Sequence, residues 1–331
     1  MTTILLTHPP QVRENYYSDK ALAALEALGG VRRNPFGREL STAELIDAAQ
    51  GCEIVVSHRH VPGDAALFAS LPALIAFCRC AIDIRNVDVD AASAHGILVT
   101  QASAGFVPAT AEWVLGAMIS LGRGIAASAA DYRAGRTPET SMGRQLSGAT
   151  LGVIGYGRIG RYLCDLALAL RMRVMVADPY AKVANAALTQ VGLPQLLAHS
   201  DFVACLALAT PETENLIDGR AFAQMKPGAF FINASRGDLV DEAALLHALD
   251  SGRLAGCALD VGRDHDQKPN PDLARHAKVV ATPHIGGLTP QATEHQALET
   301  VAQVAEILKG HAPKGAVNAD RASRLASLRH G

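Results

Sequence analysis

The chain has 331 residues, more than one hydrophobic core usually supports, which predicts two domains. Its residues are 49% apolar and 19% charged, and the net charge of −2 excludes a basic surface for nucleic acid or an anionic membrane. The N-terminus MTTILLTHPP lacks the pattern of a secretory signal, and no apolar run approaches the roughly twenty residues that span a bilayer. We therefore expect a soluble, cytoplasmic globular protein.

Short Val/Ile/Leu/Ala-rich runs alternate with longer amphipathic segments. In chain order they predict a strand at 4–8, a helix at 18–29, a strand at 53–58, a helix at 109–123, strands at 150–155, 172–178, 201–208 and 228–235, a helix at 241–252, strands at 256–261 and 278–283, and a helix at 290–310. Strands that are continuously hydrophobic are typical of parallel sheets covered on both faces. The pattern therefore predicts an α/β fold with two sheets, and the tail beyond Asn318 is expected to be loosely held.

Six cysteines are scattered through the apolar segments, at positions 52, 78, 80, 164, 205 and 257. Such residues usually behave as small buried hydrophobes in a reducing compartment. Cys78 and Cys80 form a C-x-C pair, but no second pair lies nearby to complete four zinc ligands. We expect all six to be structural.

The most specific local signal is LGVIGYGRIGR, residues 151–161. It places a G-x-G-x-x-G pattern, Gly155, Gly157 and Gly160, directly after a strand and at the start of a helix. The glycines permit a tight turn, close approach to a pyrophosphate, and close helix–strand packing. The N–H groups near Arg158 and Ile159 are expected to face the phosphates.

An acid follows at the end of the next strand. Asp178 lies where a carboxylate can bind the ribose 2′-hydroxyl of a dinucleotide. The same carboxylate repels a 2′-phosphate, so the sequence favours NAD over NADP.

Three downstream motifs carry a family resemblance. MKPGAFFINASRGDLVDEAAL (225–245), LDV (259–261) and TPHIGGLTPQA (282–292) closely resemble the D-isomer-specific 2-hydroxyacid dehydrogenases. The resemblance implies a Rossmann-type, doubly wound NAD domain over 101–285. That domain is inserted into a flavodoxin-like substrate domain made of 1–100 and 286–331, with the active site in the cleft. It also implies a homodimer contact near 104–146.

The same resemblance assigns roles to single residues. Arg236 would bind the substrate carboxylate, for which the planar guanidinium offers a bidentate fork. His284 would be the general acid/base of hydride transfer. Asp260 would lie near the nicotinamide carboxamide. Thr210, Ala234 and Gly286 are further candidates for lining the dinucleotide site.

One expected residue is replaced. Most of the family pairs the histidine with a glutamate, and the corresponding position here is His265, in the run GRDHDQKP. Either Asp264 or Asp266 turns inward and replaces the glutamate, or His265 itself partners His284 and moves the pH optimum for reduction downward. A metal site in this run is disfavoured, because three adjacent residues rarely all point at one ion, and the family needs no metal.

The expected substrate loop also departs from the family. It reads CAIDIRNVDV (80–89), with Asp83 where a glycine is usual, followed by Ile84 and Arg85. The strand at 53–58 runs into SHRH, in which Arg59 is either a specificity residue or part of a solvated loop. We expect Arg59, Asp83, Ile84 and Arg85 to contribute to the substrate site.

These patterns predict an NAD-dependent oxidoreductase that interconverts a 2-oxo acid and a D-2-hydroxy acid, with no metal. The predicted partners are a small-molecule acid and a second copy of the chain. Two alternatives remain: a dehydrogenase of another small anion, and an NAD(H)-sensing interaction protein on the same fold.

Overall fold

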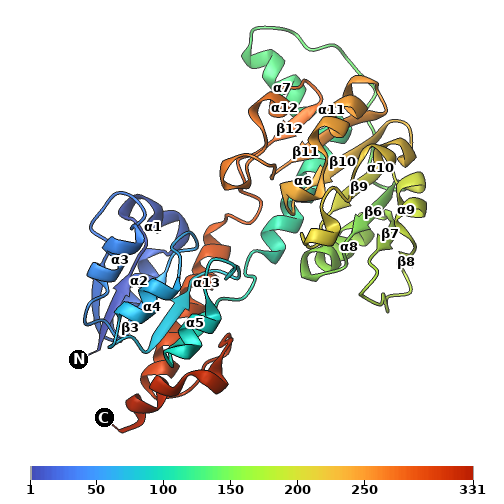
Figure 1. Ribbon diagram of the computed structural model, residues 1–331. Coiled ribbons are helices and arrows are strands. Elements are labelled where there is room, and N and C mark those ends of the chain that lie inside the picture. Colours follow the sequence, from blue (N-terminus) through green and yellow to red (C-terminus); the bar gives the residue numbers. More distant parts are fainter. Residues whose placement is uncertain (1, 331) are drawn as a thin grey trace. The chain divides into compact units, whose positions relative to one another are not determined.

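The chain divides into two compact units. The computed structural model describes residues 2–330, apart from the side chains of residues 14, 329 and 330. One unit comprises Met1–Phe106 with Leu288–Gly331, and the other is Val107–Gly287. The sequence placed its domain boundaries at 100/101 and 285/286. Each unit is built on its own parallel sheet, as the α/β prediction requires (Figure 1).

The first unit has a five-stranded sheet in the order β2-β1-β3-β4-β5. Its strands are β1 (Thr3–Leu6), β2 (Gly30–Arg33), β3 (Ile54–Ser57), β4 (Ala76–Arg79) and β5 (Leu98–Gln101). All neighbouring strands pair in parallel. This is the flavodoxin-like order, in agreement with the prediction.

Helices cover both faces of this sheet. On one face, Ile4, Leu6 and Val56 pack against α2 (Asp19–Glu26) and α13 (Pro290–Leu308). On the other, Leu5 and Val55 pack against α3 (Thr42–Ala48), α4 (Ala65–Ser70) and α5 (Val89–Ala94). A short helix, α1 (Pro10–Tyr16), follows β1. Because side chains alternate between the faces, strands buried on both sides have to be hydrophobic throughout.

The prediction of a loosely held C-terminal tail is wrong. Asn318 is buried, its amide donates to the carbonyl of Ile97, and its Oδ1 accepts from the N–H of Val99. The segment continues through η4 (Ala319–Arg321) and η5 (Ser323–His330), where Leu325 is buried and Arg324 donates to two main-chain carbonyls. The composition misled because Asn318 and Arg324 bind main-chain groups of the first unit.

The second unit has a seven-stranded parallel sheet in the order β12-β11-β10-β9-β6-β7-β8. Its strands are β6 (Thr150–Ile154), β7 (Arg173–Ala177), β8 (Thr189–Gln190), β9 (Phe202–Cys205), β10 (Ala229–Asn233), β11 (Leu254–Leu259) and β12 (Val279–Ala281). The helices are α6 (Val107–Arg123), α7 (Ile125–Arg133), α8 (Arg158–Ala169), α9 (Leu193–His199), α10 (Gly219–Gln224), α11 (Glu242–Asp250) and α12 (Pro271–Ala274).

This sheet is doubly wound. Buried residues of α6 and α8, among them Val114 and Leu163, share a core with one face, and buried residues of α9 to α12, among them Leu197 and Leu249, share a core with the other. The strand order reverses between β6 and β9, which lie side by side (Figure 1). In such sheets ligands bind at the carboxyl ends of the strands next to this reversal.

Two further expectations concern single features. All six cysteines are free and buried, as predicted. Among the described residues no single helix is long and apolar enough to cross a membrane. The bent pair α6 and α7 is long and apolar enough only when its two helices are taken together.

Candidate functional site

The glycine-rich turn between β6 and α8 has the geometry of a phosphate cradle. Gly155 has a φ of +96°, and a Cβ there would lie 2.6 Å from the carbonyl oxygen of Leu206. A Cβ on Gly160 would lie 2.2 Å from the carbonyl oxygen of Gly155. Gly157 faces open space instead. Arg158 and Ile159 begin α8, so their N–H groups have no intrahelical acceptor and are available to an anion.

Asp178 follows β7 and lies against the same turn. Its Oδ2 accepts from the N–H of Tyr156 at 2.7 Å, and its Oδ1 accepts from the N–H groups of Tyr180 and Ala181 at 2.8 Å. Burial alone would raise the pKa of Asp178, but the hydrogen bonds outweigh it and the pKa lies below its usual value. The residue therefore presents an anionic acceptor, which fits a ribose hydroxyl and repels a phosphate.

The other predicted cofactor residues follow neighbouring strands. Thr210 opens the turn η1 (Pro211–Thr213) after β9, and its N–H is bound by the Thr213 hydroxyl. Ala234 is buried directly after β10. The glycine turn, Asp178, Thr210 and Ala234 therefore all lie at the carboxyl edge of one sheet, where a dinucleotide fits.

Asp260 holds the loop that carries His284. This carboxylate, 3% exposed, accepts from the Thr282 hydroxyl at 2.6 Å, the Ile285 N–H at 2.8 Å and the Gly286 N–H at 2.7 Å. A Cβ on Gly286 would lie 2.7 Å from Asp260 Oδ2. The geometry thus gives Asp260 and Gly286 a supporting role toward the histidine loop, which sequence reasoning did not assign.

His284 is held by a main-chain group. Its backbone has a φ of 60°, and its Nδ1 lies 3.0 Å from the carbonyl oxygen of Asp266. A carbonyl oxygen can only accept, so Nδ1 carries a proton, and in the neutral imidazole Nε2 is then the nitrogen with the lone pair. Asp266 and Gln267, with φ of 57° and 59°, both adopt the left-handed conformation that presents this carbonyl.

Neither hypothesis for the missing glutamate describes this contact. The carboxylate of Asp264 accepts from the N–H of His265 at 2.7 Å within its own turn. His265 is exposed. The group bound to His284 Nδ1 is instead the main chain of Asp266, so the orientation of the ring is preserved without a side-chain carboxylate at that nitrogen.

The turn at 266–267 also contacts the Arg236 loop. Gln267 Oε1 accepts from the N–H of Gly237, and the Gln267 carbonyl accepts from the N–H of Gly262. A Cβ on Gly237 would lie 2.1 Å from the backbone of Gly262, so the two loops touch. Arg236, which is half-buried, donates from Nη1 to the carbonyl of Ser235 at 2.7 Å. The turn at 266–267 therefore contacts both the loop that carries the Arg236 cation and the imidazole of His284.

The predicted substrate residues lie in the first unit. Asp83 accepts from the Arg85 side chain at 2.6 Å, so its charge is balanced by a neighbour two residues away. Ile84 packs against the core next to α3, α4 and α5. The guanidinium of Arg59 lies 5.2 Å from the ring centroid of Tyr16.

Sequence reasoning missed two polar features here. Arg79 is fully buried and donates to the carbonyls of His58 and Val61, which holds the loop after β3. Burial lowers the pKa of Arg79 to about 10. Glu39, His58 and His60 form a cluster whose ligand atoms all lie within 4.8 Å of one another. No local pattern links Glu39 to the histidines, because it is distant from them in the chain.

The parallel sheets and the glycine turn define an α/β protein with a dinucleotide-binding fold. Residues 115–286 match the family model described as D-isomer specific 2-hydroxyacid dehydrogenase, NAD binding domain. The chain belongs to this family, as the sequence predicted, and its second unit is an NAD-binding domain.

Named relatives are similar to this chain in sequence, and solved structures are similar to it in fold. The chain is 37% identical over 259 residues to the D-3-phosphoglycerate dehydrogenase of Mycobacterium tuberculosis, a match that covers 77% of this chain and 49% of that protein. It therefore spans about half the length of these curated relatives. It is 35% identical over 271 residues to the (S)-sulfolactate dehydrogenase of Chromohalobacter salexigens, covering 80% and 88%. The structure of D-2-hydroxyisocaproate dehydrogenase shares the fold, with a TM-score of 0.86 at 24% identity over 96% of this chain and 99% of that one.

Proposed function

We propose that the chain is an NAD-dependent dehydrogenase that interconverts a 2-oxo acid and a D-2-hydroxy acid. The observation that carries this proposal is the hydrogen bond from His284 Nδ1 to the Asp266 carbonyl, because it leaves Nε2 as the proton-accepting atom. A histidine with one defined free nitrogen can act as a general base toward a hydroxyl and as a general acid toward a carbonyl.

In this mechanism Arg236 binds the substrate carboxylate through its charged fork. The glycine turn at 155–160 and Asp178 would hold NAD, which would supply the hydride chemistry at C2 of the acid. His284 Nε2 accepts the hydroxyl proton during oxidation and returns it during reduction. Asp266 keeps the ring oriented in both protonation states, because its carbonyl accepts from Nδ1–H in each. Asp260 keeps the loop of His284 in place through its bonds to residues 282, 285 and 286.

The substrate class is proposed from the relatives and from the first unit. Both named relatives, the phosphoglycerate and sulfolactate dehydrogenases, act on acids with a second anionic group. We infer that the substrate here also carries one and that Arg59 binds it. Arg85, Asp83 and Ile84 are proposed to shape the neighbouring loop, in which Arg85 compensates the charge of Asp83.

We also propose a cytoplasmic homodimer. The segment 104–146, implied by the family resemblance as the contact, includes α7, which has no buried residue. In the segment 104–146, the side chains of Ile125, Tyr132 and Met142 are 52%, 66% and 100% exposed. Light scattering on a sizing column tests the dimer: Tyr132→Glu should shift the mass toward one chain, and a monomeric wild type would contradict the proposal.

Activity is tested by following NADH absorbance with glyoxylate, hydroxypyruvate, its 3-phosphate, sulfopyruvate and phenylpyruvate. We expect turnover with a dianionic acid, and loss of at least ~100-fold in kcat for His284→Gln, the scale of general acid/base catalysis. His276→Gln, a histidine of the same unit paired with Asp250, is the control and should retain activity. Tight NADH binding without turnover of any acid would favour the NAD(H)-sensing alternative.

A further inference from the structure

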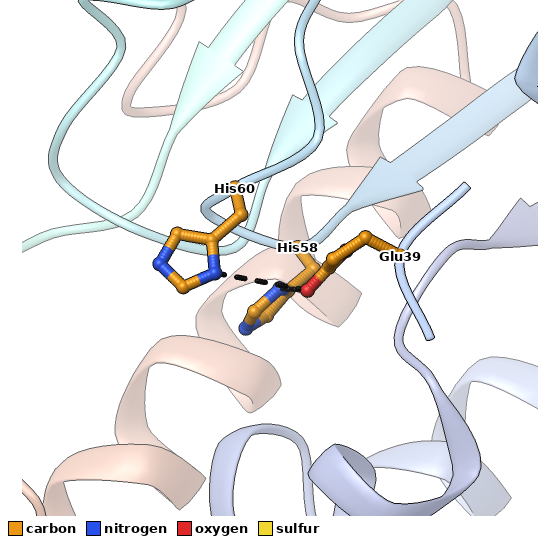
Figure 2. A group of neighbouring side chains, drawn as sticks. All are labelled: Glu39, His58 and His60. Carbon is orange, nitrogen blue, oxygen red and sulfur yellow. Dashed lines mark hydrogen bonds and ion pairs between the residues drawn. The ribbon is translucent and has the colours of Figure 1, made fainter. Parts of the chain in front are cut away.

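A second polar cluster lies in the first unit, away from the histidine loop in sequence. Glu39 lies in the loop before α3, and His58 and His60 follow β3. Glu39 Oε1 lies 2.7 Å from His58 Nδ1 and 3.7 Å from His60 Nδ1. Figure 2 shows both rings turned toward the same carboxylate oxygen. Three ligating side chains therefore converge on one point.

Several polar atoms beside this point lack partners among the described residues. They are both ring nitrogens of His8, His58 Nε2 and Glu39 Oε2. His8 is only 3% exposed, and its ring centroid lies 4.9 Å from that of His58. Buried polar side-chain atoms are nearly always satisfied, by protein, water or an ion, so unpartnered atoms gathered in one place indicate a bound species.

The carboxylate of Glu39 favours a cation as that species. Glu39 is a carboxylate, and an anion placed at its oxygen would be repelled.

We propose that Glu39, His58 and His60 bind one divalent transition-metal ion of the zinc class. Two histidines and one glutamate are a known zinc ligand set, which leaves a fourth position for water. Ligand atoms about 2.0–2.1 Å from a tetrahedral ion lie about 3.4 Å apart, and the present separations of 2.7 and 3.7 Å to Glu39 Oε1 bracket that value.

His8 completes the arrangement as a supporting residue. A metal on His58 Nδ1 requires the imidazole proton to move to Nε2, and a ligating histidine usually donates that proton to an acceptor. Nε2 of His58 has no acceptor among the described residues, while the adjacent His8 ring has two unpartnered nitrogens. His8 is therefore assigned as the residue that supports the His58 ligand.

The test uses full-length, tag-free protein treated with chelator and titrated with Co²⁺, followed by visible absorption and then Zn²⁺ competition. We expect one Co²⁺ per chain, with the intense bands of tetrahedral coordination, displaced by Zn²⁺. His60→Ala and Glu39→Gln should weaken binding at least ~10-fold, and His8→Phe should weaken it ~10–100-fold while the stoichiometry is unchanged.

The matched control is His311→Ala, which removes a histidine from a different histidine–glutamate pair in the same unit. It should leave the titration unchanged. Circular dichroism and NADH binding establish that each variant is folded. The proposal is overturned if the wild type gives no tetrahedral bands, or if folded His60→Ala and Glu39→Gln bind Co²⁺ as tightly as the wild type. The readout is independent of substrate turnover, so it does not depend on the proposed function.

Discussion

Replacing Asp260 by asparagine tests how the histidine loop is held. The carboxylate accepts three hydrogen bonds, from Thr282, Ile285 and Gly286, and is almost fully buried. Bonds to a charged group contribute about 1.5–3 kcal/mol each. An asparagine keeps one acceptor oxygen toward Thr282 and Ile285, but places an NH₂ group against the Gly286 N–H. One bond is lost and two are weakened, which costs about 3 kcal/mol in total.

This cost divides between stability and catalysis. If the loop stays in place, the free energy of unfolding falls by the full amount. If the loop relaxes, His284 moves with it and kcat/KM falls by up to about 100-fold, since about 1.4 kcal/mol corresponds to tenfold. Urea unfolding and steady-state kinetics on the same preparation measure both parts.

The matched control for this variant is Asp218→Asn. Asp218 caps α10 by accepting from the Ala221 N–H, and asparagine is as good an N-cap as aspartate, so little change is expected. If Asp260→Asn matches the wild type in both urea midpoint and kcat/KM, then the three bonds do not hold the loop and the reasoning fails.

Three further predictions follow from single residues. His265→Glu restores the residue usual in the family, but this side chain is exposed, so the apparent pKa in the pH profile of kcat should not move; a rise of about one unit would show that position 265 reaches His284. Asp178→Ser removes the carboxylate that repels a 2′-phosphate, so the ratio of kcat/KM for NADPH over NADH should rise ~10-fold or more, and an unchanged ratio would exclude this role. Burial would raise the pKa of Glu39, but the hydrogen bonds from His58 and His60 outweigh it and lower the pKa from 4.5 to about 2. The ionised carboxylate therefore stabilises the fold above pH 4.5, and this contribution is lost as the pH falls through about 2. The difference in urea midpoint between wild type and Glu39→Gln should shrink over that range. A constant difference would contradict the lowered pKa of Glu39.

The sequence predicted those parts of the fold whose signals are local. The strands at 150–155 and 172–178 are rich in Val, Ile, Leu and Met, and both form. The fingerprint glycines lie where steric contact excludes a Cβ, so their spacing identified the turn. Strand β2 escaped prediction because its four residues, GVRR, are mostly exposed and contain no hydrophobic run.

Other parts depend on contacts that sequence patterns do not encode. Every residue has a carbonyl, so no residue type could identify the Asp266 main chain as the partner of His284. The left-handed backbone at Asp266 and Gln267 occurs without glycine, which removes the usual signal. Glu39 meets His58 only through the tertiary fold.

The discontinuity of the first unit has a consequence for biosynthesis. The second unit is one continuous segment, Val107–Gly287, whereas β5 of the first unit binds Asn318, more than two hundred residues later. During translation the NAD-binding unit can therefore complete its core while the face of the first sheet that α13 covers is still bare. A nascent chain that stalls before residue 288 would display that apolar face to chaperones and proteases, although its nucleotide-binding half is already formed.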